Sequence, residues 1–233
     1  MLKIDQLHGG YVNQKIIHDI SFDVNQGEIV GLLGLNGAGK STTLQHIIGS
    51  LKPMNGMITI NGKSLLTERH LLSYIPDTPT LYPHLTVQEH FSFIRALYKE
   101  QLSDYQQELI TRYELTEHLH KYPFALSKGN KQKVSIVNAL LAKPKYLIID
   151  EPFMGLDPIG LSRFLTDLKK LRANQTAILL STHLLTIAES LCDRVVVIHK
   201  GHQVTPAEGK MVSTEKQGTL EDFFFHLVGV NDE

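Results

Sequence analysis

The chain has 233 residues, of which 42% are hydrophobic and 20% are charged, a balance typical of a globular protein. Its formal net charge of −1 excludes a strongly basic surface, so nucleic acid is not expected as a partner. The single cysteine, Cys192, excludes an internal disulfide and is expected to be buried as a small apolar side chain. No apolar stretch reaches the ~18 residues of a membrane span, so any crossing of a membrane must be made by another chain.

The N-terminal part of the chain predicts strands and a helix around a glycine-rich loop. Residues 15–24 are rich in β-branched side chains and run into a cluster of turn-forming residues. Residues 28–33 form a short apolar strand that leads directly into the glycine-rich residues 34–39. Residues 40–48 then have helical character. The order is therefore strand, loop, helix.

A second pair of strands and a helical region follow. The strands are expected around residues 57–60, closed by the Asn61-Gly62 turn. From residue 86 to about 142 the pattern is helical, and Thr86 with Glu89 three residues later predicts a capping box. Apolar residues follow this cap at helical spacing, namely Phe91, Ile94, Leu97 and Tyr98.

The C-terminal part returns to alternating strands and helices. Residues 146–149, 177–180 and 195–198 are bare apolar runs, the pattern of strands buried on both faces of a parallel sheet. The three phenylalanines 223–225 predict a C-terminal helix that packs on the core. Residues 205–218 give no clear pattern. The whole chain predicts one α/β domain with a helical insert.

The glycine-rich loop predicts a nucleotide site. Residues 34–41 read GLNGAGKS and match G-x-x-x-x-G-K-[ST], in which backbone N–H groups bind phosphate oxygens where no side chains crowd them. The Lys40 ammonium is expected to reach the outer phosphates, and the Ser41 hydroxyl is expected to bind Mg²⁺. The alternative is a flexible loop of glycines, which the flanking strand and helix disfavour. The expected nucleotide-binding residues of this segment are Gly34, Asn36, Gly37, Ala38, Gly39, Lys40, Ser41 and Thr42.

Two acids and a histidine are expected at the same edge of the sheet. Asp150 and Glu151 end one buried strand, and ligands of open parallel sheets bind where strands end. Asp150 is expected to hold Mg²⁺, and Glu151 to polarise an attacking water. The alternative is that both acids merely end a strand in solvent. His183 follows another strand and can reach the γ-phosphate or the water, although it is one of 12 histidines. His118 and His120 are interpreted as surface residues rather than metal ligands.

Further motifs resemble those of ABC ATPases. Residues 126–132, LSKGNKQ, resemble the LSGGQ-type signature of that family, and residues 155–158, GLDP, resemble its D-loop. Tyr11 lies where the family has an aromatic residue that stacks on adenine; its alternative role is packing within a strand. The resemblance implies a P-loop NTPase with a RecA-like core, an N-terminal antiparallel β subdomain and a helical subdomain. Residues 1–233 would form one domain, with the helical subdomain at about 77–143 and the rest at about 1–76 and 144–233.

The resemblance also implies how such a chain works. Two subunits would pair head to tail around two ATP molecules, each bound to Mg²⁺ and to one phosphate loop. Ser127, Gly129 and Asp157 of the other subunit would complete each site. Hydrolysis would drive a separate transmembrane permease, which would hold the chain at the cytoplasmic face of the cell membrane. The segment 76–85, which contains Tyr82, would contact that permease, or it packs as an ordinary loop.

Details of the motifs are similar to those of bacterial ABC-2-type exporter ATPases, and more loosely to the Ecs type. These details are SKG within the signature and YIPD before Thr78. Three positions depart from the common pattern. Lys128 replaces a signature glycine, and Asn130 stands in place of the usual signature glutamine. Asp77 replaces the Q-loop glutamine, so its expected role at Mg²⁺ would run through water.

Other functions remain as alternatives. An ABC importer uses the same ATPase, so the direction of transport stays open. A non-transport ABC protein would show tandem domains or a coiled-coil insert, which this chain does not have. A small GTPase would need an Asn-Lys-x-Asp motif, but Asn130-Lys131-Gln132-Lys133 lacks the acid. A regulator that binds ATP without hydrolysis is disfavoured by Glu151 and His183.

Overall fold

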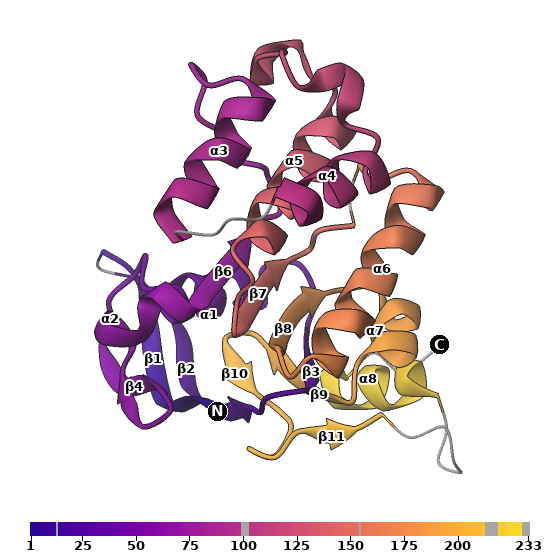
Figure 1. The fold of residues 1–233 in the computed structure, drawn as a ribbon. Helices are drawn as coiled ribbons and strands as arrows, with labels where there is room; N and C mark the ends of the chain where they lie inside the picture. The colour runs from indigo at the N-terminus through magenta and orange to yellow at the C-terminus, as the bar shows by residue number, and fades with distance from the viewer. Residues whose placement is uncertain (13, 99–102, 154, 213–218, 230–233) are drawn as a thin grey trace.

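The computed structural model of the chain describes residues 1–12, 14–98, 103–153, 155–212 and 219–229. It contains a mixed sheet with helices on both faces (Figure 1). The strands are β1 (Leu2–Tyr11), β2 (Gln14–Val24), β3 (Ile29–Leu33), β4 (Asn55–Ile60), β5 (Lys63–Ser64), β6 (Leu72–Ile75), β7 (Tyr146–Asp150), β8 (Ala177–Thr182), β9 (Arg194–His199), β10 (His202–Gln203) and β11 (Lys210–Met211). The α-helices are α1 (Lys40–Ile47), α2 (Leu65–Glu68), α3 (Val87–Tyr98), α4 (Ser103–Arg112), α5 (Lys128–Leu141), α6 (Pro158–Ala173), α7 (Leu185–Leu191) and α8 (Leu220–Val228).

The strands lie in the order β5-β4-β1-β2-β10-β9-β3-β8-β7-β6, and β11 pairs with β9. Strands β9, β3, β8, β7 and β6 are parallel neighbours, whereas β1 pairs antiparallel with β2 and β4. Every residue of β3, β7 and β8 is buried, as their apolar runs predict. The short strand β6 was not predicted, because four residues give little periodicity.

Alternate residues of the parallel strands enter two separate cores. In β7, Leu147 and Ile149 join the core beneath α5, α6, α7 and α8, whereas Tyr146 and Ile148 join the core that contains α1 and the antiparallel strands. The alternation follows from the period of two along a strand. Figure 1 shows α3, α4 and α5 gathered at one end of the molecule, with β1, β2 and β4 towards the other.

The turn and cap predicted from the sequence are confirmed. Asn61 and Gly62 have φ angles of 52° and 76°, and they join β4 to β5. At the start of α3, the Thr86 N–H donates to Glu89 Oε2 at 2.7 Å, and the Glu89 N–H donates to Thr86 Oγ1 at 3.3 Å. Of the apolar residues that follow, Phe91 is buried, but Leu97 is 59% exposed and lies off the core face.

The predictions for Cys192 and for the C-terminal aromatic residues are also confirmed. Cys192 lies in the core beside β9, and burial raises the pKa of its thiol to about 12. Phe224 is buried in α8, with Phe223 and Phe225 packed against the same core. Residues 213–218, part of the segment without a clear pattern, lie outside the described residues. None of the helices that the structure describes is both long and apolar enough to cross a bilayer.

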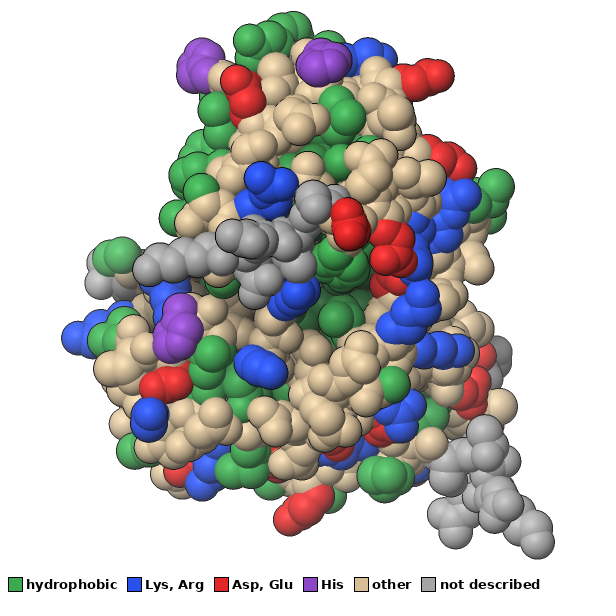
Figure 2. Space-filling view, viewed as in Figure 1, with side chains coloured by type: hydrophobic (Ala, Val, Ile, Leu, Met, Phe, Trp, Pro, Cys, Tyr) green, Lys and Arg blue, Asp and Glu red, His purple; other side chains and the backbone are tan. Residues whose placement is uncertain are grey.

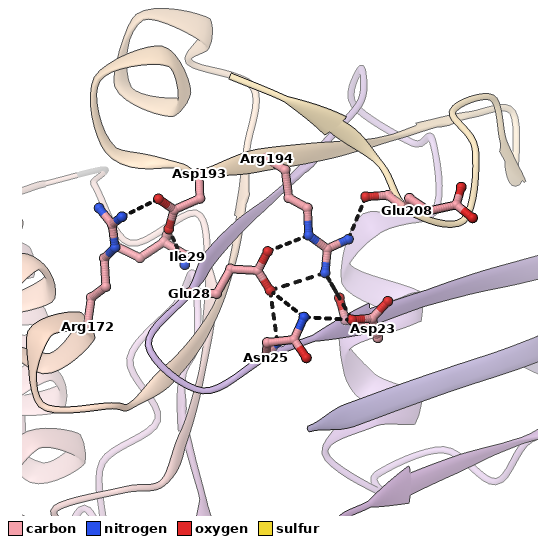
Figure 3. A network of polar contacts seen from close by, with 8 residues as sticks. All are labelled: Asp23, Asn25, Glu28, Ile29, Arg172, Asp193, Arg194 and Glu208. Carbon is pink, nitrogen blue, oxygen red and sulfur yellow. Dashed lines mark hydrogen bonds and ion pairs between the residues drawn. The ribbon is translucent and has the colours of Figure 1, made fainter. Parts of the chain in front are cut away.

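Charged side chains of both signs are mixed on the face seen in Figure 2, so the described residues of this face form no large field of one sign. A network of opposite charges is instead buried around Arg194 at the start of β9 (Figure 3). Its guanidinium donates to Glu28 Oε1 at 2.5 Å, to Asp23 Oδ2 at 3.2 Å and to the Glu208 carbonyl at 2.8 Å. Burial acts to raise the pKa of Glu28, but hydrogen bonds from Arg194 and Asn25 outweigh it and hold that pKa below its ordinary value.

The neighbouring Asp193 completes this network. Its carboxylate accepts from the Ile29 N–H at 2.9 Å and pairs with Arg172 of α6. Asp193 and Arg194 together therefore connect the start of β9 to the segment between β2 and β3, to α6 and to the segment before β11. Because β3 leads into the glycine-rich loop, this network fixes the strand that carries the candidate site.

We predict that Arg194→Met lowers the free energy of unfolding by about 3–5 kcal/mol, because it leaves the carboxylates of Glu28 and Asp23 without their buried cation. Urea unfolding followed by circular dichroism measures the change. The matched control is Lys3→Met, which removes an exposed pair with Asp5 and should cost less than about 1 kcal/mol. Equal, small losses for the two variants would show that the buried network does not stabilise the fold.

Candidate nucleotide site

The glycine-rich loop joins β3 to α1 in a conformation that only glycine accepts at key points. Gly39 has a φ of 109°, and a Cβ there would lie 2.8 Å from Ile17 Cγ2. A Cβ on Gly34 would lie 2.4 Å from the Ile198 carbonyl oxygen of β9. The loop therefore lies against the backbone of neighbouring strands, and Lys40 begins the helix with its N-terminus towards the loop.

An open pocket of about 640 Å³ lies in front of this loop. The pocket brings together residues that were predicted from four separate segments of the sequence, together with Ile16 of β2, which was not predicted. The expected residues that line it are Asn36, Gly37, Ala38, Gly39, Lys40, Ser41, Thr42, Asp77, Asp150, Glu151 and His183. Gly34 does not line the pocket, but its carbonyl accepts from Lys40 Nζ at 2.9 Å.

Glu151 lies between a lysine and a histidine at the edge of this pocket. Its Oε1 is 3.0 Å from Lys40 Nζ, and its Oε2 is 2.5 Å from His183 Nδ1. Its backbone has a φ of 42°, in the left-handed region that non-glycine residues rarely adopt. The Glu151 N–H donates to the carbonyl and to Oγ of Ser181, each at 3.2 Å, which holds this conformation.

Asp150 is held by two hydroxyl groups. Ser181 Oγ donates to Asp150 Oδ1 at 2.6 Å, and the Tyr74 hydroxyl lies 3.5 Å from Oδ2. Burial and then the Asp150 charge raise the pKa of Tyr74. Ser181 and Tyr74 were not predicted as site residues, because their positions depend on strand order. The available signal was that Ser181 directly follows the apolar run 177–180 and lies two residues before His183.

The oxygen donors at this edge fit Mg²⁺. Asp150 is only 4% exposed, and no cation among the described residues pairs with it, an arrangement that favours binding of a metal ion. Ser41 and Asp77 supply two further side-chain oxygens to the same pocket. The described part of the chain holds no cluster of three or more His, Cys, Asp or Glu side chains able to bind a metal. A small number of protein ligands is sufficient for Mg²⁺, because this ion keeps several of its waters and also binds substrate phosphates.

The remaining candidate residues lie outside the pocket. Tyr11, at the end of β1, is 48% exposed, and its hydroxyl donates to Gln45 of α1 at 3.1 Å, so packing within the strand leaves about half of the residue exposed. Ser127 caps α5 by accepting from the Asn130 N–H at 3.2 Å. His118 is partly exposed and lies 2.9 Å from Asn130 Nδ2, and it belongs to no cluster of possible metal ligands among the described residues.

The signature segment and the D-loop segment form one cluster. Asp157 caps α6 by accepting from the Gly160 N–H at 2.7 Å and pairs with the buried Lys133 at 2.8 Å. A Cβ on Gly129 would lie 2.5 Å from the Gly155 carbonyl oxygen, so the two segments are in direct contact. The hydrogen bond from Lys133, and then that from Gly160, lower the pKa of Asp157 to about 2.

The fold and the pocket define a P-loop NTPase, and comparisons with known proteins identify its family. The family described as ABC transporter matches residues 17–154. The ABC-type transporter ATP-binding protein EcsA of Bacillus subtilis is 38% identical over 97% of this chain and 96% of its own length. The lipopolysaccharide export system ATP-binding protein LptB of Haemophilus influenzae is 31% identical over 93% of this chain and 94% of its own.

Solved structures agree with this result. An ATP-binding subunit of an ABC transporter is 41% identical, with a TM-score of 0.82, and the match covers 99% of this chain and 95% of that one. A dimeric ATP-binding cassette in a post-hydrolysis state, bound to ADP and phosphate, is 22% identical with a TM-score of 0.79, over 92% of this chain and all of the other, and shares the fold. This chain belongs to the ABC transporter family and is an ATP-binding subunit with ATPase activity.

The charge of Asp157 generates a prediction for stability. Because its folded pKa is lowered, its charge stabilises the fold above its ordinary pKa of 3.8, and this contribution is lost as the pH falls towards about 2. The variant Asp157→Asn keeps an oxygen that can cap α6 but removes the charge. Half of the Asp157 side chain is exposed, so we expect the variant to be less stable by only about 1 kcal/mol near neutral pH.

This difference should shrink as the pH falls through 3.8, and urea unfolding of both proteins at a series of pH values measures it. A difference that stays constant from neutral pH to about 2.5 would show that the ion pair with Lys133 contributes nothing.

Proposed function

We propose that this chain is the Mg²⁺-dependent ATPase of a bacterial ABC exporter, and that two copies close around ATP to drive a separate transmembrane subunit. The observation that carries the proposal is the position of Glu151, which lies between Lys40 and His183 beside the phosphate loop. A carboxylate in that place can orient a water for attack on a bound triphosphate.

Binding of ATP depends on the phosphate loop and α1. Backbone N–H groups of residues 36–42 and the N-terminus of α1 bind the phosphate oxygens, and Lys40 compensates their negative charge. Lys40 is 5% exposed, so its charge acts in a region of low dielectric and has a stronger effect than it would in water. Tyr11 stacks on the adenine through its exposed ring, which its bond to Gln45 fixes next to α1.

Hydrolysis transfers the γ-phosphoryl group to water. The water oxygen forms a bond to the γ-phosphorus, the bond from that phosphorus to the β–γ bridging oxygen breaks, and ADP leaves with the electron pair of that bond. Glu151 accepts a hydrogen bond from the water and orients it. His183 holds the Glu151 carboxylate through Nδ1 and contacts the transferred phosphate. The proton of the water leaves with the phosphate product or passes to solvent.

The residues that would hold Mg²⁺ are Ser41 and Asp150 directly, and Asp77 through water. When bound, the ion neutralises charge on the β- and γ-phosphate oxygens. Ser181 positions Asp150 for this role, because its hydroxyl donates to one carboxylate oxygen at 2.6 Å. Interactions of this kind orient metal ligands in many sites.

A second copy of the chain completes each site. Ser127, Gly129 and Asp157 lie outside the pocket of their own chain and close over the γ-phosphate of the second copy. Lys128 is exposed beside Gly129, so its ammonium adds positive charge near that phosphate. The contact of Gly129 with the Gly155 backbone means that the signature and the D-loop move as one unit in each subunit.

The transmembrane partner docks on the groove beside α3. This groove, of about 360 Å³, lies between β6, α3 and α5 and is lined by Leu81, Tyr82 and Phe93 among others. Tyr82 is 58% exposed and packs edge-on against Phe93. Docking there holds the chain at the cytoplasmic face of the cell membrane. Similarity to LptB, which is named for an export system, supports export as the direction.

We predict that Glu151→Gln binds ATP with unchanged or higher affinity but hydrolyses it at least about 100-fold more slowly, because the amide cannot polarise the attacking water. Slow turnover should also trap a dimer. Phosphate release and the mass from light scattering measure the two effects, and Glu117→Gln, at an exposed position, is the control. Hydrolysis at the wild-type rate would refute the role of Glu151.

The docking groove predicts a specific cross-link. The native Cys192 is buried, so Tyr82→Cys introduces an accessible thiol to which a photoactivated cross-linker can be attached in membranes of the producing cell. We expect adducts with a membrane-spanning protein, identified by mass spectrometry. The variant Met57→Cys is the control because Met57 on β4 is also 58% exposed. Adducts of the same membrane protein from both positions, or none from Tyr82→Cys, would contradict docking at this groove.

A further inference from the structure

The turn between β9 and β10 lies against the phosphate loop, although about 160 residues separate them in the sequence. The turn consists of Lys200 and Gly201, whose φ angles of 47° and 80° are both left-handed, as in a tight two-residue hairpin. Strand β10 lies between β9 and β2 in the sheet. None of the turn residues lines the nucleotide pocket.

Gly201 connects the phosphate loop to β2 through its backbone. Its N–H donates to the Ala38 carbonyl at 2.9 Å, and its own carbonyl accepts from the His18 N–H at 2.8 Å. The end of β9 makes a second contact with the loop, because the Ile198 carbonyl oxygen occupies the space that a side chain at Gly34 would need. The hairpin thus contacts the loop near both of its ends.

The bond to Ala38 fixes the direction of a group that faces the nucleotide. In a trans peptide the C=O and the following N–H point in opposite directions, and the described residues contain no cis peptide. Holding the Ala38 carbonyl against Gly201 therefore directs the Gly39 N–H away from the turn. Gly39 lines the pocket, so its N–H is available for a phosphate oxygen.

The turn cannot move freely. A Cβ on Gly201 would lie 2.1 Å from the carbonyl oxygen of Ile16, which lines the pocket. Beside it, the imidazole rings of His18 and His202 stack with centroids 4.7 Å apart and an angle of 9° between their planes. The stack joins β2 to β10 on either side of Gly201 and braces the turn.

We propose that the β9–β10 turn is a positioning element of the nucleotide site, with Gly201 orienting the phosphate loop. The proposal rests on nucleotide binding at the pocket described above. Displacing the turn rotates the Ala38–Gly39 peptide and weakens nucleotide binding, while the folded chain keeps its sheet. Gly201 acts through the loop and does not contact the nucleotide.

The test compares two glycine variants by titration with a fluorescent ATP analogue, at a temperature where both are folded. Gly201→Ala introduces the clash with Ile16 and should raise the Kd about 10-fold or more. Gly62→Ala is the matched control, because Gly62 has a φ of 76° but no atom within 4 Å of a Cβ. It adds similar backbone strain far from the loop, so its Kd should stay within about twofold of wild type.

A folded Gly201→Ala protein with the Kd of the wild type would overturn the proposal. So would an equal rise in both variants, because backbone strain alone would then explain it. If Gly201→Ala does not fold, His202→Ala decides the question: loss of the ring stack should raise the Kd about threefold, and an unchanged Kd would overturn the proposal. Failure of the wild-type chain to bind the analogue would instead refute the nucleotide site itself.

Discussion

The contact between Lys40 and Glu151 depends on the position of one strand. Lys40 follows β3, and Glu151 follows β7, but these strands are not neighbours, because β8 lies between them. Strand β8 supplies Ser181, which holds the Glu151 backbone and the Asp150 carboxylate, and its end places His183 beside Glu151. Since all three strands are parallel, their carboxyl ends meet at one edge, and the side chains converge without any long loop.

Burial gives this arrangement its chemical significance. The Lys40 side chain is 5% exposed and that of Glu151 is 18% exposed, so their charges interact with little screening by water. The cost of burying them is reduced by the carbonyl groups of residues 34 and 35, which accept from Lys40, and by His183 beside Glu151. The left-handed backbone of Glu151 is a further local strain, of the kind found at functional sites.

The sequence predicted the elements with strong local signals. The phosphate loop has a dense pattern of glycines with a fixed chemical role, and the buried strands are uninterrupted apolar runs, so both could be located. Ser181, Tyr74 and Ile16 could not be assigned to the site, because their roles depend on which strands are neighbours. The hydrophobic periodicity of a segment does not reveal the order of strands in the sheet. Leu97 has the spacing of a core residue but is exposed, since the width of the apolar face of α3 depends on what packs there. The turn at Gly201 was missed because its importance comes from a contact distant in the sequence.

The central claim is that the acids at the end of β7 and the lysine of the phosphate loop act on one nucleotide. A crystal structure of the chain with Mg²⁺ and a non-hydrolysable ATP analogue tests it most directly. We expect the γ-phosphate to lie within hydrogen-bonding distance of Lys40 Nζ, and the metal ion to bind the Ser41 hydroxyl with Asp150 in its coordination shell. A nucleotide bound away from the phosphate loop, or a metal ion remote from Asp150, would show that the lysine and the acids do not act on one nucleotide.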